Sequence, residues 1–252
     1  MEVLKNSDII LCEDTRRTLK LLNHFNIKSK LISYHKFNET KELKLVIQHL
    51  KEGKILSLVS DAGTPTLSDP GMILVRKCVE NHIKIFPIPG PSSITASMSI
   101  SGFDDKFLFY GFLPKKELEL NRVLKKIKDY NYSLIFFVPG IKINFYLNIF
   151  KKFFYDRDIL IAREISKVHE TFYRDSVKSI EPFKATLKGE LTIVISKKYN
   201  NNEKISDEEI KKLSIKYLKK YSLKDAVNLI SKKEKLSKKK VYTICLKLKK
   251  DE

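Results

Sequence analysis

"KILSLVSDAGTPTLSDPG", residues 54–71, begins as an apolar run and ends in a cluster of Gly and Pro. The run shows no polar alternation, which is typical of a strand buried on both faces of a parallel sheet. The same combination returns in KIFPIPGPSSITA, residues 84–96. The chain has 8 Pro in 252 residues, and five of them lie between 65 and 91. Ligands of open α/β sheets bind beyond the carboxyl ends of the strands, so these two stiff loops indicate a binding site.

Strands and helices alternate on both sides of this segment, which predicts a doubly wound α/β sheet over residues 1–104. The expected strands there are 7–13, 30–35, 54–61 and 84–90, and the expected helices are 15–27, 38–53, 69–83 and 91–101. The pattern of strand-like and helical segments over residues 105–197 predicts a second α/β domain with a mixed sheet. Its expected strands are 107–114, 133–140, 158–164, 170–177 and 190–196, and its expected helices are 115–130 and 142–154.

The C-terminal part predicts a polar linker over 199–204 and a small basic helical segment over 205–252. Ser222 and Ser237 are suited to be helix N-caps around a turn. Two interpretations stay open for this segment. It is a helix-turn-helix that binds nucleic acid, or a helical cap with a solvated Lys face.

The charge and the Cys content limit the class of protein. A net charge of +19 favours a polyanionic partner such as nucleic acid, although 42 Lys against 7 Arg also fits AT-rich codon drift. The three Cys lie far apart, which predicts neither disulfides nor a zinc site and favours the cytoplasm. No apolar run approaches the ~18 residues of a membrane span. The motifs GxGxxG, GxxxxGK[ST] and HExxH are absent.

Six segments in order give the chain a resemblance to a known family. They are DIILCEDTRRT, LVSDAGTPTLSDPG, PIPGPSSITASMSISGF, FYGFLPKK, IAREISKVHETFYRDS and KGELTIVI. Together they resemble the ribosomal RNA small subunit methyltransferase I family of the tetrapyrrole methylase superfamily. The resemblance implies two α/β domains and S-adenosylmethionine (SAM) as methyl donor. It also implies 2′-O-methylation of a cytidine in the decoding region of 16S rRNA, with rRNA or the 30S subunit as partner, usually in a homodimer.

The resemblance also implies a cofactor pocket, made by the two Gly/Pro loops and the helix after them. Its expected residues are Asp61, Ala62, Gly63, Thr64, Pro65, Ile88, Pro89, Gly90, Pro91, Ser92 and Ala96. The four Arg in motif-like positions are candidates for RNA phosphates, since guanidinium binds phosphate in a bidentate manner. They are Arg16, Arg17, Arg163 and Arg174. No metal is invoked.

Methyl transfer to a ribose hydroxyl benefits from a general base. Asp14, Glu164 and His169 are the candidates, and the sequence does not rank them. Each has a structural alternative. Asp14 is also suited to cap a helix, Glu164 is suited to pair with Arg163, and a lone His is often structural.

Two departures from the family pattern leave other functions open. The family begins with a strand and a loop like ATPIGN, and we expect the first domain to lack that strand. FVPGIKI (residues 137–143) replaces a segment like YESPHR. The alternatives are a tetrapyrrole methyltransferase and a non-catalytic RNA-binding remnant.

Overall fold

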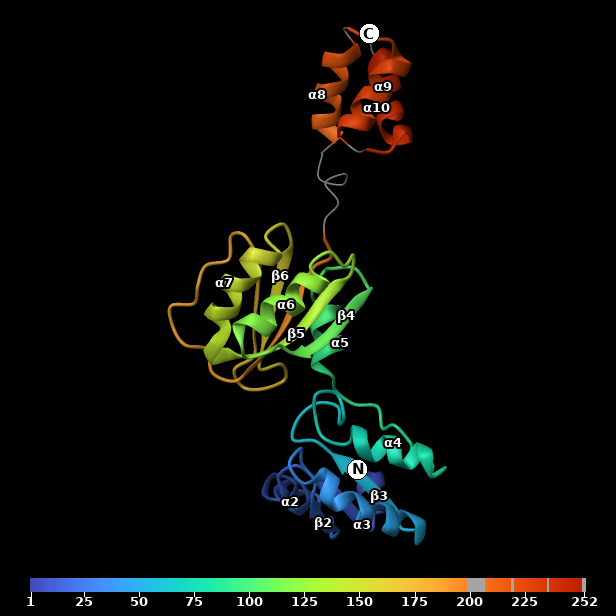
Figure 1. The fold of residues 1–252 in the computed structure, drawn as a ribbon, viewed down its shortest axis with the longest axis vertical. Helices are drawn as coiled ribbons and strands as arrows, with labels where there is room; N and C mark the ends of the chain where they lie inside the picture. The colour runs from blue at the N-terminus through green and yellow to red at the C-terminus, as the bar shows by residue number, and fades with distance from the viewer. Residues whose placement is uncertain (199–206, 219, 235, 251–252) are drawn as a thin grey trace.

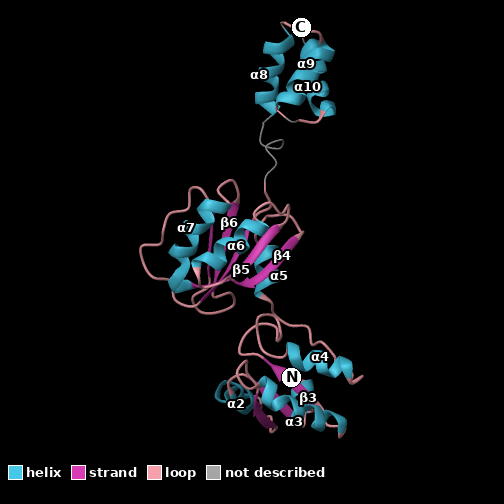
Figure 2. Ribbon diagram, in the orientation of Figure 1, coloured by secondary structure: helices cyan, strands magenta, loops and turns pink. Residues whose placement is uncertain are grey.

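The computed structural model describes residues 1–198, 207–218, 220–234 and 236–250. Three groups of elements follow one another along the longest axis (Figure 1): a small sheet with its helices, a larger sheet with its helices, and the C-terminal helices. The strands belong to the first two groups (Figure 2). Within the described ranges, no helix has the length and apolar character needed to cross a membrane.

The first sheet has three parallel strands in the order β2-β1-β3. They are β1 (Ile9–Cys12), β2 (Lys30–Ser33) and β3 (Leu56–Val59). The helices around them are α1 (Glu2–Lys5), α2 (Thr15–His24), α3 (Glu39–Lys51) and α4 (Met72–Glu80). Leu11 packs with α3 and α4, whereas Ile10 packs with Leu22 of α2. Because alternate residues of β1 point to opposite faces, one strand supports both helical layers.

The strand predicted over residues 84–90 does not form, so this prediction is wrong. Phe86 and Ile88 are 77% and 64% exposed instead of buried. Pro87, Pro89 and Pro91 are spaced two residues apart. Alternate residues of a strand present their N–H groups to the same edge, so Pro87 and Pro89 remove two donors from one edge of the predicted strand, and Pro91 removes the next. The segment therefore runs as an extended loop.

The second sheet has five strands in the order β4-β5-β8-β6-β7. They are β4 (Phe107–Phe112), β5 (Ser133–Pro139), β6 (Asp158–Arg163), β7 (Thr171–Ser176) and β8 (Glu190–Ile195). Of the neighbouring strand pairs in this sheet, β4 and β5 are parallel and the other three are antiparallel, so the predicted mixed sheet is confirmed. The helices α6 (Glu117–Ile127) and α7 (Ile143–Phe153) cover one face, and the turn η1 (Gly140–Lys142) precedes α7.

The other face of this sheet is covered by α5 (Ser93–Ser99). Ile94 of α5 packs with Ile135, Leu160 and Val194 of three neighbouring strands. The chain therefore leaves the first sheet at β3 and reaches the second sheet at α5. Both Gly/Pro loops lie on this path, between the two sheets.

The C-terminal helices are α8 (Asp207–Leu218), α9 (Leu223–Lys233) and α10 (Lys238–Lys250). They share a separate apolar core that includes Ile210, Val227 and Val241. The predicted caps are confirmed. Ser222 Oγ accepts from the N–H of Asp225, and Ser237 Oγ accepts from the N–H of Lys240, both at 3.2 Å. The linker predicted over 199–204 lies outside the described residues.

Candidate active-site cleft

A cleft of about 830 Å³ lies between the two sheets. Its first wall is the loop after β3 and the loop that leads into α5. Its second wall is formed by the ends of β4, β5 and β8 and by the segment after β6. The wall residues used below are Ala62, Gly63, Thr64, Ser68, Asp69, Gly90, Pro91, Ser92, Ala96, Glu164, Lys167 and Glu190.

Seven of the eleven residues predicted for the cofactor line this cleft, namely Ala62, Gly63, Thr64, Gly90, Pro91, Ser92 and Ala96. The remaining four, Asp61, Pro65, Ile88 and Pro89, are neighbours in the chain that do not form its wall. The two loops are joined directly, because Thr64 Oγ1 donates to the carbonyl oxygen of Pro91 at 3.3 Å.

The cleft fits a nucleoside-sized cofactor. Its volume lies within the ~300–1,000 Å³ of small-molecule sites. Gly63 has a φ of +75°, and a Cβ placed on it meets no atom within 4 Å. Backbone without a side chain therefore faces the open cleft at this position, which lets a ligand approach the main chain closely.

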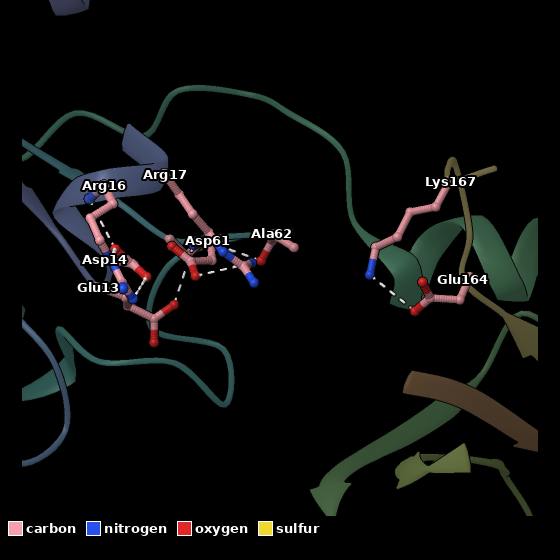
Figure 3. Close-up of polar contacts among 9 residues, drawn as sticks. Glu13, Asp14, Arg16, Arg17, Asp61, Ala62, Glu164 and Lys167 are labelled. Carbon is pink, nitrogen blue, oxygen red and sulfur yellow. Dashed lines mark hydrogen bonds and ion pairs between the residues drawn. The ribbon is translucent and has the colours of Figure 1, made fainter. Parts of the chain in front are cut away.

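The loop after β1 is tied to the loop after β3 (Figure 3). The N–H of Asp61 donates to Glu13 Oε2 at 3.2 Å, and Arg17 Nη1 lies 3.2 Å from Asp61 Oδ2. Arg17 remains 70% exposed. The Arg17 ion pair partly neutralises Asp61 and leaves most of the guanidinium accessible at the rim.

Asp14 caps α2 and pairs with the next-but-one residue. Its Oδ1 accepts from the N–H and Nε of Arg16, and its Oδ2 lies 2.8 Å from Arg16 Nη2. These Arg16 contacts hold the pKa of Asp14 well below its usual range. Asp14 is thus ionised at neutral pH and lies outside the cleft wall. Asp14 therefore acts as a helix cap, and its role as a base stays a prediction.

Glu164 lines the second wall of the cleft. Its Oε1 accepts from Lys167 Nζ at 3.0 Å (Figure 3). The same oxygen accepts from the N–H of Glu190 at 3.1 Å. These two contacts lower the pKa of Glu164. The partner of Glu164 is therefore Lys167 and not the neighbouring Arg163. His169 lies exposed on the connection between β6 and β7, outside the wall.

The two Arg of the second sheet bind backbone carbonyls. Arg163 Nε donates to the carbonyl of Lys188 at 3.1 Å, and Arg174 Nη2 donates to the carbonyl of Ile100 at 2.9 Å. Arg174 thereby ties β7 to the end of α5. These contacts give both side chains a structural role, and their role toward RNA phosphates stays a prediction.

Asp69 is a cleft residue that the sequence reasoning missed. Burial and the neighbouring carboxylates of Glu13 and Glu190 raise the pKa of Asp69 to about 6. The available signal was its place in the same Gly/Pro segment, just before α4. In the described part of the chain, no three His, Cys, Asp or Glu side chains are grouped to hold a metal ion.

The comparisons with known proteins agree with this architecture. The family model for tetrapyrrole (corrin/porphyrin) methylases matches residues 1–181. The ribosomal RNA small subunit methyltransferase I of Mesomycoplasma conjunctivae is 40% identical over 200 residues, which are 79% of this chain and 84% of that protein. This chain belongs to the ribosomal RNA small subunit methyltransferase I family. The protein of the same name from Buchnera aphidicola subsp. Schizaphis graminum is 38% identical over 256 residues, covering 98% and 89% of the two chains.

A solved methyltransferase confirms the predicted fold class. The uroporphyrin-III C-methyltransferase of Thermus thermophilus, complexed with S-adenosylhomocysteine, superposes with a TM-score of 0.52. It is 13% identical and covers 77% of this chain and 88% of that one. The chain thus has the tetrapyrrole methylase fold, and its family consists of SAM-dependent methyltransferases.

Proposed function

We propose that this chain transfers the methyl group of SAM to the 2′-oxygen of a cytidine in the decoding region of 16S rRNA. The observation that carries the proposal is the cleft between the two sheets, where both Gly/Pro loops meet the second wall. The names of relatives at 38–40% identity support an rRNA substrate. The net charge of +19 favours RNA over a tetrapyrrole.

The residues of the cleft have separate tasks in this reaction. The loops at 61–65 and 88–92, together with Ala96, hold and orient the cofactor, which supplies an activated methyl group. The stiffness of the proline-rich loop lowers the entropy lost on binding. Arg17 is exposed at the rim, where it is suited to an RNA phosphate. Arg16 is 86% exposed while it holds Asp14, and it is suited to the same task.

The test uses the full chain with SAM carrying a tritiated methyl group. Three substrates are offered in parallel: 30S subunits without this modification, free 16S rRNA, and uroporphyrinogen III. A 2′-O-methyl group protects the following phosphodiester from alkaline hydrolysis, so we expect the label in an alkali-resistant dinucleotide that contains cytidine. Mass spectrometry of nuclease fragments then locates the nucleotide.

Each other outcome contradicts a specific part of the proposal. Label in alkali-sensitive nucleotides means methylation of a base, and label in the macrocycle means a tetrapyrrole methyltransferase. If calorimetry detects no SAM binding while RNA binds, the chain is a non-catalytic RNA-binding protein.

We also propose a homodimer, as the family resemblance implies. Sedimentation at a monomeric mass would contradict that part alone.

A further inference from the structure

Asp69 reaches the cleft from the loop between β3 and α4. The nearby Ser60 side chain lowers the pKa of Asp69 and so partly offsets the effect of burial. Across the described residues, no Lys or Arg lies within ion-pair distance of it. Asp69 thus differs from Asp14 and Glu164, which are each held by a cation. Lone pairs of the Asp69 carboxylate remain available to a ligand in the cleft.

The loop that carries Asp69 is strained and tightly packed. Thr66 and Ser68 have φ values of 73° and 70°, in the left-handed region that side chains disfavour. A Cβ on Gly71 would collide with Leu58 of β3. On the other side, a Cβ on Gly111 of β4 would lie 2.8 Å from Ser68 Oγ. The loop is therefore packed tightly between β3 and β4. Backbone strain that is held in place by such packing is typical of functional sites.

Three carboxylates lie near Asp69, two of them from elements other than its own loop. Glu13 comes from the connection after β1, Asp61 from the loop after β3, and Glu190 from the start of β8. Burial disfavours the ionised form of Asp69, and the negative charge of these carboxylates adds to the effect, so its pKa lies at about 6. A base with a pKa near the working pH combines the ionised state with proton affinity. The lowered pKa values of Asp14 and Glu164 make them weaker proton acceptors.

We propose that Asp69 is the general base of the methyl transfer, accepting the proton of the ribose 2′-hydroxyl. This inference rests on the function proposed above. The 2′-oxygen forms a bond to the methyl carbon, and the bond from that carbon to the sulfonium sulfur breaks with its electron pair left on sulfur. The hydroxyl proton moves to an Asp69 oxygen, and the carboxylic acid then releases it to water. The products are the methyl ether and S-adenosylhomocysteine.

The test compares the full chain with Asp69→Asn, Asp69→Glu and the control Asp105→Asn. Asn keeps the shape of Asp69 but accepts no proton, and Asp105 is an exposed aspartate before β4. With 30S subunits, we expect Asp69→Asn to lower kcat about 100-fold or more, and Asp69→Glu to restore part of it. The wild-type kcat should rise with pH, reach half of its maximum near pH 6 and level off above that, and Asp69→Asn should lack this rise. Calorimetry should show that Asp69→Asn binds SAM with an affinity within about twofold of the wild type.

Three outcomes would overturn the inference. If Asp69→Asn keeps more than about a tenth of the wild-type kcat, another group accepts the proton. If it lowers SAM affinity as much as kcat, Asp69 is a cofactor-binding residue. If the wild-type chain binds SAM but methylates no RNA, the proposed function fails, and the base assigned to it fails with it. If both the wild type and Asp69→Asn are active, the assignment of Asp69 as the base is rejected and the proposed function stands.

Discussion

The carboxylate of Glu164 occupies the space where Gly189 would carry a side chain. A Cβ built on Gly189 would lie 2.5 Å from Cδ of Glu164, and Gly189 has a φ of +89°. The absence of a side chain lets Glu164 accept the N–H of Glu190 and fix the second wall of the cleft.

Gly189→Ala is therefore expected to destabilise the fold in two ways. The left-handed backbone costs about 1–2 kcal/mol with any Cβ, and displacement of Glu164 adds to this cost. Gly102→Ala is the matched control, since Gly102 has a φ of +72° and a Cβ there meets nothing within 4 Å. Thermal unfolding should show a lower Tm for Gly189→Ala than for Gly102→Ala. Equal values would mean that Glu164 moves aside at no cost.

Arg157 is buried, and its guanidinium fastens one end of the second sheet. It donates to the carbonyls of Lys128, Tyr130 and Ser196. Its side chain is 1% exposed and lies over the Phe154 ring. Lys has a single ammonium group and cannot satisfy carbonyls spread over a guanidinium plane.

Arg157→Lys should thus leave buried carbonyls without a donor and lower the free energy of unfolding by about 3 kcal/mol. Denaturant titration measures this change, with Arg122→Lys on the exposed side of α6 as control. We expect the control to change stability by less than about 0.5 kcal/mol. A similar small change for Arg157→Lys would show that water replaces the lost contacts.

Asp69 gives stability an unusual pH dependence. Its pKa rises from 3.8 to about 6 in the folded chain, so the folded state favours the protonated carboxyl. The stability it contributes is full below about pH 4 and is lost as pH rises through about 6. Asp69→Asn should therefore gain stability relative to wild type between pH 4 and 7. We expect a gain of about 1–2 kcal/mol, because solvent screens this half-exposed group. A gain that does not depend on pH would contradict the raised pKa.

Much of the fold followed from apolar patterning, and the failures have identifiable causes. The buried runs at β1, β5 and β8 form strands because their backbone donors and acceptors find neighbours on both edges. Residues 84–90 have the same apolar character, but their prolines lack the donors. The pattern of apolar residues reports burial, whereas a strand also needs a complete hydrogen-bonding edge.

The site was harder to predict, because its side chains are placed by contacts between distant segments. The glycines and prolines of the two loops are local signals, and most of the cofactor residues inferred from them lie in the cleft wall. The contact of Glu164 with Gly189 and the raised pKa of Asp69 depend on β8 and on the loop after β1. The order of residues along the chain does not reveal that these segments lie close together.

Gly63 offers the sharpest test of the cleft. Gly63 and Gly53 have φ values of +75° and +83°, and a Cβ on either one meets nothing within 4 Å. Valine should therefore cost the fold a similar amount at both positions, about 1–2 kcal/mol. Only Gly63 lines the cleft, so Gly63→Val alone places methyl groups where the cofactor is proposed to bind. Calorimetric titration should show SAM affinity at least about tenfold weaker for Gly63→Val and unchanged for Gly53→Val. If both variants bind SAM like the wild type, the cofactor does not approach the backbone at this loop, and the pocket assigned to residues 61–65 is wrong.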